Sequence, residues 1–65
     1  MSLVELSRYD RNLANIIVGR LEAEGIAAFP FDAGASIADG SWLLIPVRVM
    51  VDEHDLAAAR AVVGD

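Results

Sequence analysis

The residues with the clearest chemical potential are four polar side chains in one short run, Asp52, Glu53, His54 and Asp55. His54 is the only histidine, and a general base needs a partner and a pocket. The three carboxylates lack the D-x-D-x-D-G spacing and the distal glutamate of a calcium loop. Carboxylates also stabilise the start of a helix. We therefore predict that Asp52 caps a helix, with Asp55 at the capping-box position, and that His54 faces solvent.

A second candidate is the run of small residues from 33 to 41, which Trp42 closes. This run lacks the Gly-Lys-Ser/Thr end of a P-loop and the G-x-G-x-x-G spacing of a dinucleotide site. One interpretation is a plain surface connection in which Trp42 packs over the edge of the core. The other is a ligand-binding loop, because tryptophan is enriched at binding hot spots. The ligand-binding residues would then be Asp32, Ser36, Asp39, Trp42 and Arg48.

The inventory of reactive side chains argues against catalysis. An enzyme needs a nucleophile with its base, or a metal cluster. The chain has no cysteine and no lysine, and its one histidine lies among carboxylates at an expected helix start. We expect no catalytic residues, no metal site and no cofactor.

The amino-acid composition limits the classes of partner that this chain is expected to bind. Ten acidic residues against five arginines leave a formal charge of −5, and the arginines are scattered along the chain. Nucleic-acid-binding proteins usually have a clustered basic face, so we expect neither nucleic acid nor an anionic membrane surface as partner. The longest apolar run, from Trp42 to Val47, is far shorter than the ~20 residues of a membrane span. The N-terminus lacks the features of a signal peptide, so we expect a cytoplasmic protein.

The first half of the chain predicts a strand followed by a helix. Leu3–Ser7 partly alternates as a strand does. Asp10 is a suitable N-cap for a helix over Arg11–Glu24, and Gly25 is a suitable left-handed residue at its end. The inner stripe of this helix would comprise Leu13, Ala14, Ile17, Val18 and Leu21.

The second half predicts two strands and a helix. Phe29 and Phe31 share one side of a strand over residues 27–32, and Pro30 places that strand at a sheet edge. A strand near residues 46–51 would have Val47, Val49 and Val51 on one face and Arg48 and Met50 on the other. The last helix would run from the Asp52 cap to about Val63, with Leu56, Ala59 and Val63 inside.

The order of these elements predicts an α+β, ferredoxin-like β-α-β-β-α fold in a single domain over residues 1–65. A right-handed crossover between the first two strands leaves room for the third between them. The antiparallel sheet order is then 1-3-2, with both helices on one face. The first strand keeps a free edge, to which a second chain could add. The helix-free face is expected to hold a Glu5–Arg48 ion pair and Leu3, Ala28, Pro30 and Met50.

Two segments carry a resemblance to a known family. They are the run from Arg20 to Phe29, which contains Leu21-Glu22-Ala23-Glu24-Gly25-Ile26, and the run Val47-Arg48-Val49-Met50-Val51-Asp52-Glu53-His54-Asp55. Together they resemble the family described as putative prokaryotic signal-transducing protein, over about residues 3–63. The resemblance implies a ferredoxin-like, PII-like architecture and a regulatory role, with no established ligand or reaction. Family members often have Gly-Gly where this chain has Ile45-Pro46, so no glycine-dependent motion is carried over.

These observations predict a small regulatory or interaction module without catalytic activity. A domain of this size removes only about 60% of its unfolded surface on folding, so self-association would add stability. We expect a homodimer or another protein partner, bound through the sheet edge or the open sheet face, with Leu3, Glu5 and Met50 in the interface. The alternative is a small-ligand sensor that binds at the loop before the third strand.

Overall fold

The computed structural model describes residues 2–32 and 46–64. These residues form three strands, two α-helices and one 3₁₀ turn. In chain order they are β1 (Leu3–Tyr9), α1 (Arg11–Ala23), β2 (Ala28–Asp32), β3 (Val47–Asp52), η2 (Glu53–Asp55) and α2 (Leu56–Val63). The predicted α+β order is confirmed. None of the helices in the described ranges is long and apolar enough to cross a membrane.

Both ends of α1 follow from local hydrogen bonding. Asp10 has an extended backbone, and its Oδ1 accepts a hydrogen bond from the Leu13 N–H at 2.9 Å. At the other end Gly25 has φ of 82°, and its N–H donates to the Glu22 carbonyl at 3.0 Å. The Ile26 N–H donates to the Leu21 carbonyl at 2.9 Å, and both side chains are buried. This is a Schellman motif, and it turns the chain from α1 toward β2.

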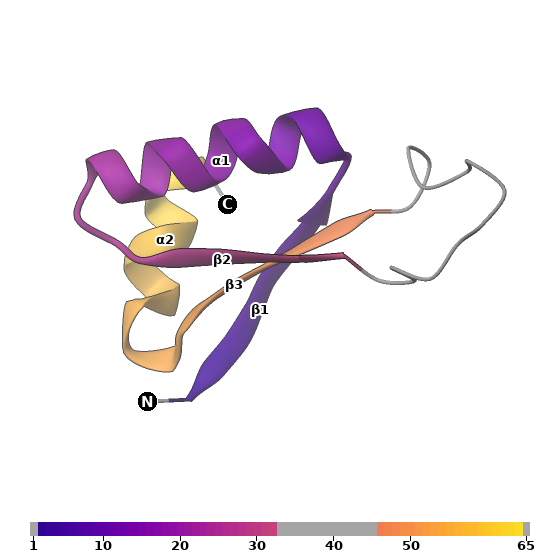
Figure 1. Ribbon diagram of the computed structural model, residues 1–65. Helices are drawn as coiled ribbons and strands as arrows, with labels where there is room; N and C mark the ends of the chain where they lie inside the picture. The colour runs from indigo at the N-terminus through magenta and orange to yellow at the C-terminus, as the bar shows by residue number, and fades with distance from the viewer. Residues whose placement is uncertain (1, 33–45, 65) are drawn as a thin grey trace, which may run out of the picture.

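The three strands form one antiparallel sheet in the order β1-β3-β2, as predicted (Figure 1). Side chains of α1 and α2 join the strand residues of one face in a single hydrophobic core. The opposite face has no helix of the described chain upon it (Figure 1). The fold is therefore two layers, with one sheet face closed by helices and one open.

β1 is longer than the sequence predicted, because it contains a bulge. The pairing of β1 with β3 shifts between Glu5 and Ser7, so Leu6 is the extra residue. Beyond the shift the strand continues to Tyr9, which pairs with Val47. The bulge reverses which residues face the helices, and this hid the second half of the strand from a simple alternation pattern.

The core is built from small and branched side chains. Every buried residue in the described part of the chain is apolar. They are Leu6, Ala14, Leu21, Ile26, Ala28, Val47, Val49, Val51 and Ala59. The prediction for β3 is confirmed, but the placement of Leu13 in the inner stripe was wrong, because Leu13 is 41% exposed. Leu13 lies about 100° around the helix from the buried Ala14, outside the narrow strip that the sheet covers.

Candidate functional site

The open sheet face is the candidate site, and the strand register decides which residues it contains. Residues that pair across an antiparallel sheet lie on the same face. On β3 the helix-facing valines alternate with Arg48, Met50 and Asp52. The open face is therefore made of three cross-strand rows. They are Leu3–Asp52, Glu5–Met50–Phe29 and Arg8–Arg48–Phe31, each given in the strand order β1, β3, β2.

The register corrects the prediction for β2. Ala28 pairs with the buried Val51 and is itself buried, so it faces the helices and not the open face. Pro30 pairs with Val49 and lies on the same helix-facing side. The open face instead contains Phe29 and Phe31. Alternation showed that the two phenylalanines share a side, but the choice of side depends on pairing with β3.

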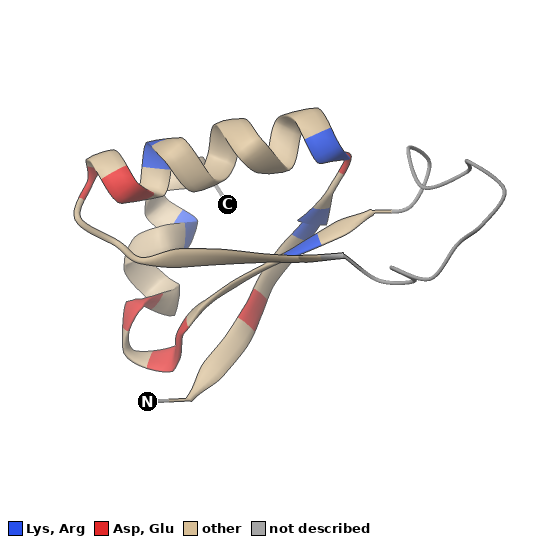
Figure 2. Cartoon of the chain, in the orientation of Figure 1, with Lys and Arg blue, Asp and Glu red and all other residues tan. Residues whose placement is uncertain are grey.

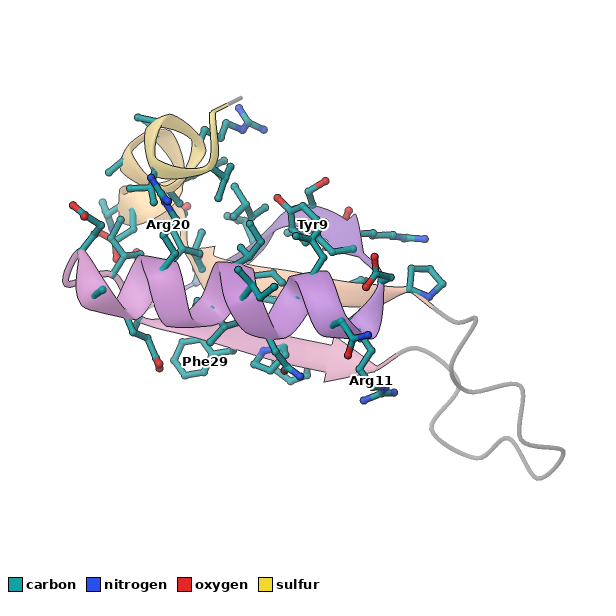
Figure 3. All side chains as sticks on the ribbon, turned by 90° about the horizontal axis from the view of Figure 1, so that it is seen from above. Tyr9, Arg11, Arg20 and Phe29 are labelled. Carbon is teal, nitrogen blue, oxygen red and sulfur yellow. The ribbon has the colours of Figure 1, made fainter. Side chains whose placement is uncertain are left out.

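The open face carries large apolar side chains in all three rows. We call Leu3, Phe29, Phe31 and Met50 the open-face cluster. Leu3 and Phe29 are each 37% exposed and Phe31 is 44% exposed, while Met50 is half-buried. Viewed from the helix side, the ring of Phe29 projects past the outer margin of β2 and does not enter the helix–sheet core (Figure 3). Large apolar side chains gathered on one exposed face are typical of an interaction surface.

Charges divide the open face along its length. Arg8 and Arg48 lie opposite each other at the end where β1 finishes and β3 begins. Asp52 lies at the opposite end of β3, and Glu5 lies between. Figure 2 shows blue segments on β1, β3 and the start of α1 at the first end, and most red segments at the other end, where α1 and α2 also carry blue segments. The open face therefore has a cationic end, although the chain has a net charge of −5.

The expected Glu5–Arg48 ion pair is not formed. Glu5 lies opposite Met50, and its Oε1 is 3.3 Å from Nε of Arg8 on the same strand. The Leu6 bulge causes this difference, because it brings Arg8 onto the open face beside Glu5 and opposite Arg48. Both members of the Glu5–Arg8 pair are well exposed, so the pair contributes only about 0–1 kcal/mol.

Asp52 and His54 form a local cap, as the sequence predicted for Asp52. The Asp52 carboxylate accepts a hydrogen bond from the His54 N–H at 2.8 Å, and Nδ1 of His54 lies 2.9 Å from the same oxygen. The hydrogen bond from the His54 backbone N–H is the main cause that lowers the pKa of Asp52 below its usual value, and the contact with the His54 side chain lowers it further. The His54 side chain is 84% exposed, as expected. Asp55, however, makes no side-chain capping bond, because the 3₁₀ turn η2 separates Asp52 from α2.

The structure brings some of the predicted site residues together. Leu3, Glu5 and Met50, the predicted interface residues, all lie on the open face. Of the predicted ligand-binding residues, Arg48 lies on the open face, and Asp32 is the last residue of β2. The other three, Ser36, Asp39 and Trp42, lie outside the described residues. Ligand binding at the connection between β2 and β3 therefore stays a prediction. Among the residues in the described ranges, no group of acidic or histidine side chains is arranged to hold a metal ion.

Sequence reasoning missed three residues of the open face, Arg8, Phe29 and Phe31. The two phenylalanines had no local signal for their side of the sheet, because alternation shows only that they share one. Arg8 had no such signal either, because one inserted residue in β1 decides its side of the sheet.

The bulge also affects the free edge of β1, since bulges twist an edge away from further pairing. On the other edge, Pro30 cannot donate a backbone hydrogen bond. Both edges are thus less suited to adding a strand than the open face is to packing.

Comparison with known families gives one match. The family model described as "Putative prokaryotic signal transducing protein" matches residues 3–65. This range includes every described strand and helix. Neither the comparison with curated proteins nor that with solved structures finds a match.

Proposed function

We propose a specific role for this chain from one premise, that it belongs to the family of putative prokaryotic signal transducing proteins. It is a cytoplasmic, non-catalytic regulatory module that works by binding a second copy of itself through the open sheet face. The observation that carries the proposal is the open-face cluster, in which Leu3, Phe29 and Phe31 are each more than a third exposed.

Packing of the open-face cluster would be energetically significant. Full burial of a wholly exposed phenylalanine or leucine side chain contributes about 1.5–3 kcal/mol, and Leu3, Phe29 and Phe31, at 37–44% exposed, would each contribute part of that. In a symmetric dimer each residue counts twice, because both copies use the same surface. A small domain that buries a modest core gains most from such an interface. Phe29 and Met50 lie in the middle row of the face, and the residues that dominate binding energy usually lie near the centre of an interface.

Charge complementarity favours a second copy as the occupant of this face. Arg8 and Arg48 lie at one end of the open face, and Asp52 lies at the other, with Glu5 between. A two-fold axis through the region of Met50 would place the arginine end of each copy over the acidic end of its partner. The face is thus complementary to itself in an antiparallel arrangement, as an isologous dimer requires.

The described side chains offer support for a role without catalysis. Asp52 and His54 form an acid–histidine contact on a turn at the surface, where the His54 side chain is 84% exposed. A general base acts best where water is excluded and a substrate is held close. The chemistry of this exposed turn is explained by capping alone.

Sedimentation equilibrium of the full chain tests the proposed self-association. We expect a monomer–dimer equilibrium at tens of micromolar, and Phe29→Ser should weaken it by about 100-fold, as expected for an aromatic residue that supplies much of the binding energy. Ile16→Ser is the matched control, because Ile16 is 66% exposed on α1 and lies away from the open face. The native chain running as a monomer throughout this range would overturn the proposal, as would equal effects of the two variants.

A further inference from the structure

A pair of like charges on the open face leads to a separate inference. Arg8 and Arg48 lie directly opposite each other on β1 and β3. Directly opposed residues on one face have Cβ atoms about 4.5–5.5 Å apart, and like charges at that separation destabilise a sheet. We propose that Arg8 and Arg48 form a binding site for a phosphate monoester, with Phe31 beside them to contact the organic part of the ligand.

The hydrogen-bonding state of Arg48 points to a missing acceptor. The Arg48 side chain is half-buried, and its Nε atom is shielded from solvent with no hydrogen-bond partner in the described structure. A shielded charged donor without an acceptor costs more than an ordinary hydrogen bond contributes. An anion placed between the two guanidinium groups would accept from the terminal N–H groups of Arg48, since Nε itself is closed to solvent, and would neutralise the repulsion with Arg8.

Arg8 keeps donors for the same anion. It contacts Glu5 through Nε at 3.3 Å, in a pair that solvent screens. A guanidinium has five N–H donors, so this contact uses a small part of its capacity. The Glu5 contact also orients the Arg8 side chain on the open face. The site therefore combines one half-buried guanidinium with one exposed guanidinium that is held by a carboxylate.

The charge and shape of the arginine pair indicate which class of ligand it would bind. Two guanidinium groups match a phosphate monoester, which carries about −1.5 to −2 charge near neutral pH and binds the arginine fork with two parallel hydrogen bonds. A carboxylate would neutralise half of that positive charge. Phe31 lies in the same cross-strand row as Arg48, so an apolar side chain flanks the cationic pair. The ligand class is therefore a small molecule with a phosphate group next to an apolar or aromatic part.

This inference does not rest on self-association, although the two share a surface. The site is complete within one chain, because Arg8, Arg48 and Phe31 all come from one sheet. If a second copy covers the face, its acidic end lies over the same arginines. Phosphate binding should then weaken the dimer, so the concentration of the ligand would control the oligomeric state of the proposed regulatory module.

The test uses phenyl phosphate and inorganic phosphate as probes, with chloride at the same ionic strength as reference. Amide NMR spectra at low micromolar concentration, below the self-association range, should shift at β1 and β3 with phenyl phosphate. Phenyl phosphate should bind more tightly than inorganic phosphate, and Phe31→Ser should remove that difference. Arg8→Gln and Arg48→Lys should each weaken binding about 10-fold, since each removes hydrogen bonds to a charged group.

Matched controls separate this site from general charge effects. Arg20→Gln and Arg60→Gln remove the same charge from exposed positions on the two helices, in the other layer of the domain. Figure 3 shows Arg20 on the helix side. These variants should bind the probes as the native chain does. Equal weakening by the controls, or no phosphate response beyond that of chloride, would overturn the site, whereas a monomeric native chain would overturn the proposed dimer alone.

Discussion

The two faces of the three-stranded sheet differ in how deeply they bury neighbouring residues of the same strand. On β3, Val49 is fully buried beneath the helices, whereas the next residue, Met50, lies half-buried on the open face. The closed face holds apolar side chains that are covered within the chain. The open face holds apolar side chains too, but no described element covers them. Large apolar side chains in every row, together with charges at the two ends, distinguish a binding face from one adapted only to water.

The largest expected effect contrasts lysine at two adjacent positions. Val49→Lys places a charge among the buried valines, so it should destabilise the fold by several kcal/mol and leave the domain largely unfolded. Met50→Lys should leave the fold intact and abolish self-association, because its charge lies at the centre of the open face. Circular dichroism in urea and sedimentation equilibrium measure the two results. Similar unfolding by both variants would show that the faces are not energetically distinct.

The next effect concerns the turn after α1, which allows this helix to pack over the closed face. Gly25 has φ of 82°, which allows α1 to end and β2 to pair beneath it. Gly25→Ala should cost about 1–2 kcal/mol, because a Cβ disfavours the left-handed conformation. A Cβ at this position would meet no neighbouring atom within 4 Å, so the cost comes from the backbone alone. Urea unfolding measures it, and an unchanged midpoint would contradict the conformational explanation.

A smaller effect is expected at the beginning of α1. Asp10→Ala removes the acceptor of the Leu13 N–H and should cost about 1 kcal/mol. Asp10→Asn retains a side-chain acceptor and should cost less. Thermal unfolding of the two variants compares them. Neither variant should change self-association, since α1 belongs to the closed side, and a change in the dimer constant would link the two faces.

The smallest effect is a pH dependence at the acidic end of the open face. The folded pKa of Asp52 lies below its usual value of 3.8, so folding favours its ionised form. Its contribution to stability is complete above the unfolded pKa and is lost as the pH falls through the lower folded pKa. Asp52→Asn should remove this acid-side slope. His54→Ala should retain most of it, because the backbone N–H remains the main cause. Urea midpoints between pH 2 and 6, spanning about two units either side of the usual carboxyl pKa, check both.

Much of the fold could be predicted from local signals. The caps at Asp10 and Asp52 and the left-handed Gly25 were predictable, because each depends on residues within a few positions. The central place of β3 was predictable from the handedness of the crossover. Leu13 was misplaced, because a hydrophobic stripe shows which residues are near the core and not how far the sheet extends beneath them.

The candidate site was predictable in part. Leu3, Glu5 and Met50 were placed on the open face correctly, since β3 has an unambiguous valine face and the first residues of β1 pair with it regularly. Arg8 was not predictable, because one extra residue at Leu6 changes the side on which every later β1 residue lies. The sides of Phe29 and Phe31 depended on a register with residues some twenty positions away.

The sequence by itself determined the order of elements, the ends of the first helix and the all-valine face of the central strand. These features arise from short-range hydrogen bonding and from side-chain periodicity, which act within one segment. Only the tertiary structure decided that Phe29 and Phe31 join Met50 on the open face and that Arg8 stands opposite Arg48. Strand pairing between distant segments sets those positions, and a shift of one residue would have reversed them.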